Sequence, residues 1–163
     1  MFEYLKPYIY KNVREKVKTA NSFYPVSKKE IDDYEKYYRY ALPTQLKTFY
    51  KEVGYGFLTH PHQYNKEYAF CNTNRFNPPS LMNEMLLQGQ ESGLISEDAH
   101  ELLYQGDLPF FEIGDSSSFM FMKALSDNPN AVWYMGAIKI EDSLEAFVHN
   151  LYYRDPAYYA NTW

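Results

Sequence analysis

The chain has a single cysteine, Cys71, among its 163 residues. One thiol excludes a framework of internal disulfides and is typical of proteins from a reducing compartment. Long apolar runs are also missing, since the longest, over 131–138, is far shorter than the ~20 residues that a membrane helix needs. Charged residues spread through 1–18 exclude the apolar segment of a signal peptide. We therefore expect a cytoplasmic protein that does not enter a membrane.

Basic residues are scarce in the last two thirds of the chain. Residues 52–163 carry five Lys or Arg against fifteen Asp or Glu, whereas residues 1–51 carry eleven against six. Binding to a phosphate backbone requires clustered Lys and Arg, so direct binding to nucleic acid is not expected. An acidic surface suits a basic protein partner. The simpler alternative, that both surfaces only keep the protein soluble, stays open.

Catalytic and metal-binding signatures are missing as well. His60 and His62 could face one metal from a strand, but Pro61 interrupts that strand and no third ligand stands at a recognisable spacing. The pair of Gly54 and Gly56 lacks the third glycine and the following helix of a dinucleotide-binding loop. We therefore expect no catalytic residues, no metal and no cofactor. A hydrolase that uses His60 and His62 is the weakest of the alternatives considered.

Helical periodicity dominates the first part of the chain. The spacing of apolar residues predicts an amphipathic helix over 10–20. A second helix is expected to begin at the capping box of Ser27 and Glu30. A third helix is expected to have Pro43 in its first turn and apolar residues at helical spacing over 46–53, and to end at Gly54, as is typical of a C-terminal cap.

Short strand-like segments follow, separated by turns rich in Asn, Pro, Ser and Asp. We expect strands over residues 55–60, 68–71, 110–113, 119–122, 131–135 and 138–140, with 72–79 as a loop. Helices are expected over 80–87 and 96–104, and a last helix begins at Asp142 or Ser143. This order indicates one α+β domain with a mostly antiparallel sheet, N-terminal helices and a closing C-terminal helix.

The whole chain, 1–163, is expected to form that one domain. Residues 1–26 would be an N-terminal helical extension, 27–153 the core and 154–163 a tail. Most of the eighteen tyrosines and eleven phenylalanines are expected to complete the core. The side chains expected to be largely buried are Leu46, Phe49, Val53, Phe111, Ile113, Trp133, Phe147 and Leu151.

Several of these segments together form a recognisable pattern. An amphipathic helix, a Leu-Pro step, a second helix and a Gly-containing exit are followed by an apolar strand that ends in Gly-Asp, by further strands and by a helix with a Phe-Leu stripe. They correspond to Ile31–Tyr40, Leu42-Pro43, Leu46–Val53, Gly54–Leu58, Phe110–Asp115, Phe119–Met122, Ala131–Met135 and Leu144–Leu151. In this order the chain resembles the SUKH superfamily, which includes bacterial immunity proteins and relatives of a fungal regulator of cell-wall synthesis. It departs from the family at Phe110 and Phe111, where a Trp is common, and at 116–118, where a glycine-rich turn is common.

The resemblance implies a non-enzymatic protein that binds and neutralises a bacterial toxin, often a nuclease. The fungal relatives imply an alternative, a regulatory scaffold linked to cell-wall synthesis. The expected partner is a basic toxin domain, and the protein itself is expected to be a monomer or a weak dimer. Acids at strand ends and turns, with two tyrosines, are the partner-binding candidates: Asp107, Glu112, Asp115, Asp127, Glu141, Asp142, Tyr55 and Tyr134.

The lack of a third metal ligand beside His60 and His62 gives a first prediction. Metal analysis of protein purified without a histidine tag should find no stoichiometric transition metal, because two histidines do not complete a site. One equivalent of metal that is lost when His60 and His62 are replaced would instead favour the hydrolase.

Overall fold

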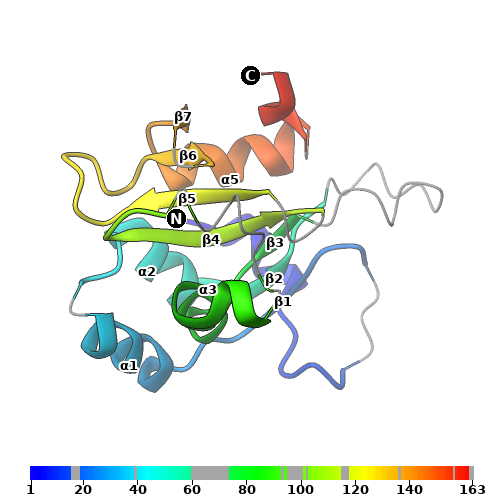
Figure 1. The fold of residues 1–163 in the computed structure, drawn as a ribbon. Helices are drawn as coiled ribbons and strands as arrows, with labels where there is room; N and C mark the ends of the chain where they lie inside the picture. Colours follow the sequence, from blue (N-terminus) through cyan, green and yellow to red (C-terminus); the bar gives the residue numbers. More distant parts are fainter. Residues whose placement is uncertain are drawn as a thin grey trace.

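The fold is a single sheet whose strands follow one another in chain order (Figure 1). The computed structural model describes residues 1–15, 19–38, 40–59, 74–92, 94, 101, 103–114, 118–135, 137–155 and 157–161. Each strand pairs antiparallel with the next. The strands are β1 (Ser22–Tyr24), β2 (Tyr55–Phe57), β3 (Asn74–Phe76), β4 (Asp107–Ile113), β5 (Phe119–Lys123), β6 (Val132–Tyr134) and β7 (Ile138–Glu141). The expected α+β fold with an antiparallel sheet is therefore confirmed.

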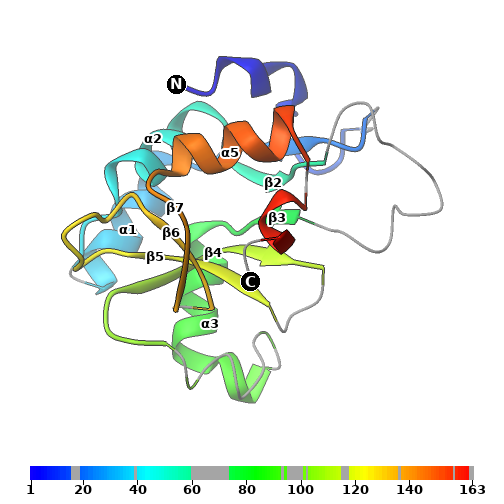
Figure 2. The ribbon, with the colours of Figure 1, turned by 90° about the horizontal axis from the view of Figure 1, so that it is seen from above.

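Helices cover both faces of this sheet. Among the described residues, the helices are η1 (Glu3–Tyr8), α1 (Lys28–Tyr38), α2 (Thr44–Glu52), α3 (Pro79–Ser92), α5 (Leu144–Tyr153) and η2 (Tyr158–Asn161). Figure 2 shows α2 and α5 on one side of the β4–β5 pair and α3 on the other. Side chains of β5 alternate accordingly: Met120 and Met122 join the main core, whereas Phe119 and Phe121 pack with Met85 of α3. Within the described residues, no helix has the length and apolarity needed to span a membrane.

The N-terminal segment differs from the expected helix. The helix that the structure describes there is the short η1, and Ile9 then makes a parallel bridge to Phe23 of β1. Val13, expected on the apolar face of a helix, is 66% exposed. Residues 16–18 lie outside the described part of the chain. The prediction of a helix over 10–20 is wrong because pairing with β1 outweighs a weak local propensity.

Local capping signals predicted the next two helices correctly. The backbone N–H of Glu30 donates to Ser27 Oγ at 3.1 Å, at the start of α1. Pro43 stands just before α2, in the N-cap position rather than in the first turn. At the other end, the N–H of Gly54 donates to the carbonyl of Phe49. Ile31 and Tyr34 of α1 are buried.

Two glycines allow β2 to approach β1 closely. Gly54 and Gly56 have φ values of +107° and +145°, which favour glycine. A Cβ at these positions would lie 1.9 Å from the carbonyl oxygen of Tyr24 and 2.0 Å from that of Ser22. The Gly-containing exit after α2 is thus a steric requirement of the β1–β2 pair.

The expected strands after residue 110 are confirmed, with ends that differ by a few residues. The expectation of a loop over 72–79 is wrong at β3, which pairs with both β2 and β4. The helix predicted over 80–87 is longer, because α3 extends to Ser92. The strand predicted over 68–71 and most of the helix predicted over 96–104 lie outside the described residues.

Aromatic rings from four elements meet in the main core. Phe49 of α2 stacks on Phe76 of β3 at 4.5 Å between ring centroids, and Phe76 meets Phe111 of β4 at 4.9 Å. Phe111 meets Phe147 of α5 at 5.1 Å. The predicted burial is confirmed for Leu46, Phe49, Val53, Phe111, Phe147 and Leu151.

Two residues of the predicted core are only half-buried. Ile113 packs at the edge of the main core. Trp133 pairs across strands with Phe121 and therefore lies on the side of the sheet that carries α3, away from α5. There the ammonium of Lys123 lies 4.6 Å from the centre of its ring. The register therefore places Trp133 on the α3 face of the sheet rather than in the main core.

Replacement of Phe147 tests this arrangement. Phe147→Ala should lower the free energy of unfolding by about 3–5 kcal/mol, because it leaves a cavity among buried rings. The control is Tyr153→Ala on the same helix, whose side chain is exposed and should cost far less. Urea unfolding followed by circular dichroism measures both, and equal losses would contradict the assigned core.

Candidate partner-binding surface

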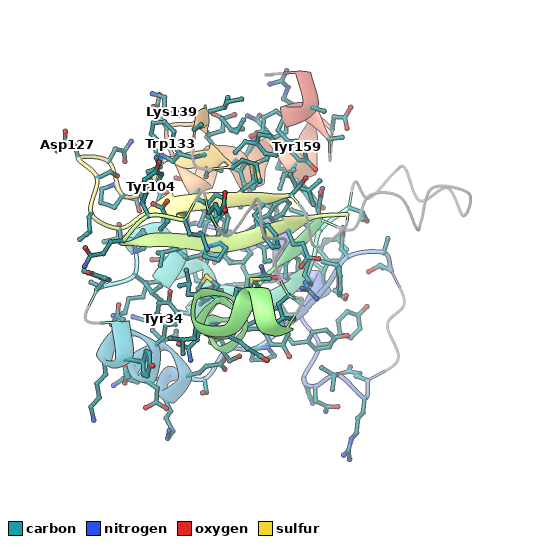
Figure 3. The ribbon with its side chains drawn as sticks, viewed as in Figure 1. Tyr34, Tyr104, Asp127, Trp133, Lys139 and Tyr159 are labelled. Carbon is teal, nitrogen blue, oxygen red and sulfur yellow. The ribbon has the colours of Figure 1, made fainter. Side chains whose placement is uncertain are left out.

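Antiparallel pairing brings the predicted acids of several strands to one end of the sheet. The register pairs Asp107 with Lys123 and Val132 with Glu141, so β4 and β6 begin where β5 and β7 end. We call this region the Asp127 end, made of residues 103–108, 123–132 and 141–145. Figure 3 shows Asp127, Tyr104, Trp133 and Lys139 on this side of the molecule, away from Tyr159.

Three exposed acids lie at this end, namely Asp127, Asp142 and Glu145, and we call them the acidic edge. Asn128 joins two of the segments, because its Nδ2 donates to the backbone carbonyl of Asp142 at 2.9 Å. Lys139 Nζ lies 2.7 Å from Asp142 Oδ1 in an exposed ion pair. Such a pair contributes little to stability, so Asp142 stays accessible to a partner.

Capping bonds fix the acidic edge to two helices. Asn130 Oδ1 accepts from the backbone N–H of Gln45 at the start of α2, at 3.0 Å. Gln45 Oε1 in turn accepts from the N–H of Glu145 at 2.9 Å. Ser143 Oγ accepts from the N–H of Ala146, which confirms the expected start of the last helix. Because free N–H groups of both helices are satisfied here, the β5–β6 turn is held to the rest of the fold.

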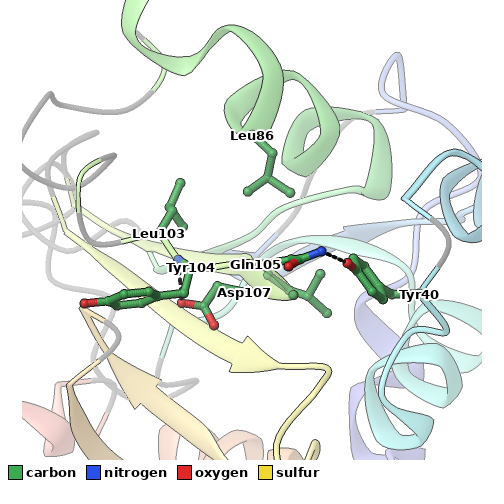
Figure 4. A pocket seen from close by; sticks show the side chains of 8 residues that line it. Tyr40, Leu86, Leu103, Tyr104, Gln105 and Asp107 are labelled. Atoms are coloured by element: carbon green, nitrogen blue, oxygen red, sulfur yellow. Dashed lines mark hydrogen bonds between the residues drawn. The ribbon is translucent and has the colours of Figure 1, made fainter.

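A pocket of ≈ 370 Å³ adjoins the β4–β5 side of this end (Figure 4). We call it the Tyr104 pocket; it is lined by Tyr40, Leu86, Leu103, Tyr104, Gln105, Gly106, Asp107 and Leu108. The backbone carbonyl of Gly106 accepts from the N–H of Ala124 at 2.9 Å. The exposed Leu125 lies against Gly106. The pocket is therefore continuous with the turn that carries Asp127.

Asp107 lines this pocket but differs from the exposed acid expected from the sequence. Asp107 is 4% exposed, and its Oδ2 accepts a hydrogen bond from the backbone N–H of Tyr104 at 3.2 Å. Burial raises the pKa of the Asp107 carboxyl above its usual value, although the Tyr104 N–H and Lys123 act in the opposite direction. Asp107 is therefore accessible only through the pocket and is not part of an open rim.

The remaining predicted residues lie elsewhere or are partly engaged. Glu141 is at the Asp127 end but half-buried, where it accepts from Asn150 Nδ2 at 2.7 Å. Glu112 is ion-paired with Arg75 at the opposite end of β4. Tyr134 packs against the main core at the end of β6.

Tyr55 is on β2, separated from β5 by two strands, with its ring 5.7 Å from that of Tyr24. Asp115 lies outside the described residues, as do His60, His62 and Cys71. Among the residues that the structure does describe, no three His, Cys, Asp or Glu side chains form a group that could hold a metal ion.

Sequence reasoning missed the aromatic part of the surface. Tyr104 is 69% exposed, yet the spacing placed it at the end of a helix. Tyr40 follows the C-terminal end of α1, and its hydroxyl accepts a hydrogen bond from the side-chain amide of Gln105. The signal that the sequence offered was a tyrosine two residues before a glycine. In the structure Gly106 has a φ of +87° and forms a tight turn into β4.

Comparison with known proteins agrees with this architecture. The model of the SMI1 / KNR4 family (SUKH-1) matches residues 25–150, which include the strands β2–β7 and the whole Asp127 end. The chain is 32% identical over 139 residues to the "Immunity protein YxxD" of Bacillus subtilis (strain 168), covering 85% of this chain and 88% of that protein. No solved structure matches significantly. With a family model matched over most of its length and a relative similar across nearly all of both chains, the protein belongs to the SMI1 / KNR4 family (SUKH-1).

Proposed function

We propose that this protein is an immunity protein, which binds a protein toxin directly and thereby neutralises it. The observation that supports this most strongly is the similarity to a protein named as an immunity protein, which extends over 85% of this chain. Neutralisation by binding requires no catalytic group, in keeping with the absence of a catalytic signature from the sequence. The proposed site of action is the cytoplasm.

The acidic edge supports a basic partner. Asp127, Asp142 and Glu145 are exposed at one corner, and negative charge on a surface accelerates encounter with a positively charged protein. A toxin that binds nucleic-acid phosphates, such as a nuclease, has the required basic surface. We therefore propose a basic toxin domain as the partner class.

The Asp127 end also has the composition of an interface. Exposed Tyr104 and Leu125 provide an apolar centre, and the acidic edge provides a charged rim. Recognition surfaces in proteins commonly combine these two parts, and tyrosine is frequent among the residues that contribute most to binding. Of the eight residues predicted from the sequence, Asp107, Asp127, Glu141 and Asp142 belong to this end. Glu112, Tyr55 and Tyr134 stay predictions at other places, and Asp115, outside the described residues, stays a prediction as well.

Growth rescue tests the function itself. Cells that express the toxin encoded by the neighbouring gene should grow when this protein is co-expressed, and the two purified proteins should bind. If this protein neither rescues growth nor binds that toxin, the immunity proposal is wrong. Rescue without binding would contradict neutralisation by direct contact.

Charge reversal tests the surface. The double variant Asp127→Lys with Asp142→Lys should slow association about tenfold or more at low salt and flatten its salt dependence, because exposed charges act mainly on the association rate. Stopped-flow or surface-plasmon measurements at two salt concentrations give both quantities. Unfolding free energy should change by less than ~1 kcal/mol, since the ion pair that is lost, Lys139 with Asp142, is exposed.

A matched control is available on α1. Asp32→Lys with Asp33→Lys changes the net charge equally and breaks one exposed ion pair, that of Lys29 with Asp33. This control should slow association much less if the acidic edge faces the toxin. Equal effects of the two double variants would show that only net charge matters, and the partner surface would then have to be sought elsewhere.

A further inference from the structure

The buried carboxylate of Asp107 has little compensation from the protein itself. It accepts one hydrogen bond, from the Tyr104 N–H, and no ion pair to it occurs within the described part of the chain. Its cross-strand neighbour Lys123 places its ammonium over the ring of Trp133. A buried charge without a close counter-ion is costly, so a cation that enters the pocket would gain from meeting it.

The electrostatics of Asp107 also favour a cation in the pocket. Desolvation has the largest effect on its pKa and outweighs both the Tyr104 N–H and the charge of Lys123. The ionised form is therefore less stable than in water, and a positive group at hydrogen-bond distance would restore it. No such group comes from the described residues that line the pocket, which contribute no Lys, Arg or His.

The walls of the Tyr104 pocket suit one kind of cation. Figure 4 shows Tyr104 and Tyr40 at its two ends, with Asp107 and Gln105 between them. Leu86 and Leu103 add apolar surface. An arginine side chain combines an apolar stem with a planar guanidinium that can stack on an aromatic ring and pair with a carboxylate. The volume of ≈ 370 Å³ is near the lower limit of the ~300–1,000 Å³ typical of ligand pockets, which favours one side chain over a larger ligand.

We propose that the Tyr104 pocket receives an arginine side chain of the protein partner. Its guanidinium pairs with Asp107 and lies against Tyr104, while its stem packs on Leu86 and Leu103. The inference rests on the proposed immunity function for the source of the arginine, and it adds a specific anchor to that surface. Anchors of this kind, in which one buried side chain enters a pocket, often dominate the affinity of an interface.

A test that needs no toxin uses small amides of single amino acids. N-acetyl-L-arginine methylamide, titrated into the ¹⁵N-labelled full-length protein, should shift the backbone amide signals of Tyr104, Gln105, Gly106 and Asp107 in a saturable way. The citrulline analogue has nearly the same shape without the charge and should bind at least about tenfold more weakly, since hydrogen bonds between charged groups are the stronger ones. The lysine analogue should fall between the two, because it lacks the planar group that stacks on tyrosine. Equal responses to arginine and citrulline, or no response at these four amides, would overturn the proposal.

Variants assign the effect to particular groups. Asp107→Asn keeps an oxygen that can accept from the Tyr104 N–H but removes the charge, so arginine and citrulline should then bind equally weakly. Tyr104→Ala should weaken the binding of arginine several-fold, because it removes a ring that the guanidinium contacts. Tyr153→Ala is a matched control at another exposed tyrosine and should leave the titration unchanged. Unchanged arginine binding in Asp107→Asn contradicts the proposed pairing.

The toxin separates this proposal from the immunity proposal. If the unmodified protein binds the toxin, Asp107→Asn and Tyr104→Ala should each raise the dissociation constant about tenfold or more, mainly through faster dissociation. Toxin binding that both variants leave intact would show that the partner does not use the pocket and would overturn the inference, while leaving the immunity function in place. If the unmodified protein does not bind the toxin, the immunity proposal fails, and the amide titration still decides whether the pocket accepts arginine.

Discussion

The line of rings from Phe49 through Phe76 and Phe111 to Phe147 is the contact on which the other elements depend. Each ring comes from a different element, and the centroid separations of 4.5, 4.9 and 5.1 Å are those of direct aromatic contact. Through these rings α2 and α5 are held against the middle of the sheet, although the two helices are far apart in the chain. The fixed position of both helices then determines where their N-termini lie, which is beside the turn that carries Asp127.

The chain-order sheet explains why this turn is available to a partner. In an antiparallel sheet whose strands follow chain order, successive connections lie at alternate ends, so the segments before β4, after β5 and after β7 collect at one end. Asn130 and Gln45 then tie the β5–β6 turn to the starts of α2 and α5. Loops held on a rigid scaffold are common recognition sites, because they can vary without changing the core. The Asp127 end therefore combines a fixed position with exposed side chains.

The sequence predicted the elements whose signals are local. The helix starts at Ser27 and Ser143 and the stop at Gly54 each involve bonds within a few residues, and all three were found. By contrast, β1 and β3 have three residues each and exist because neighbouring strands pair with them. No local pattern encodes such pairing, so β3 was expected to be a loop and the segment before β1 a helix.

The same distinction applies to the binding surface. Asp127 and Asp142 could be predicted because they stand at a turn and at a helix start, where polar residues are normally exposed. The Tyr104 pocket could not, because it forms only when Tyr40, Leu86 and the segment before β4 come together in the folded protein. Burial of Asp107 and exposure of part of Trp133 follow from strand register across the sheet, which a single sequence does not reveal.

Hydrogen exchange of this protein, alone and saturated with the proposed toxin partner, tests the central claim most directly. Binding at the Asp127 end should slow exchange of the backbone amides in 104–107 and 124–130, which lie in turns at that end. Amides near Glu112 and in the 10–15 segment should exchange at unchanged rates. Protection confined to those latter segments, with none at 104–107 and 124–130, would contradict the assignment of the Asp127 end as the partner-binding surface.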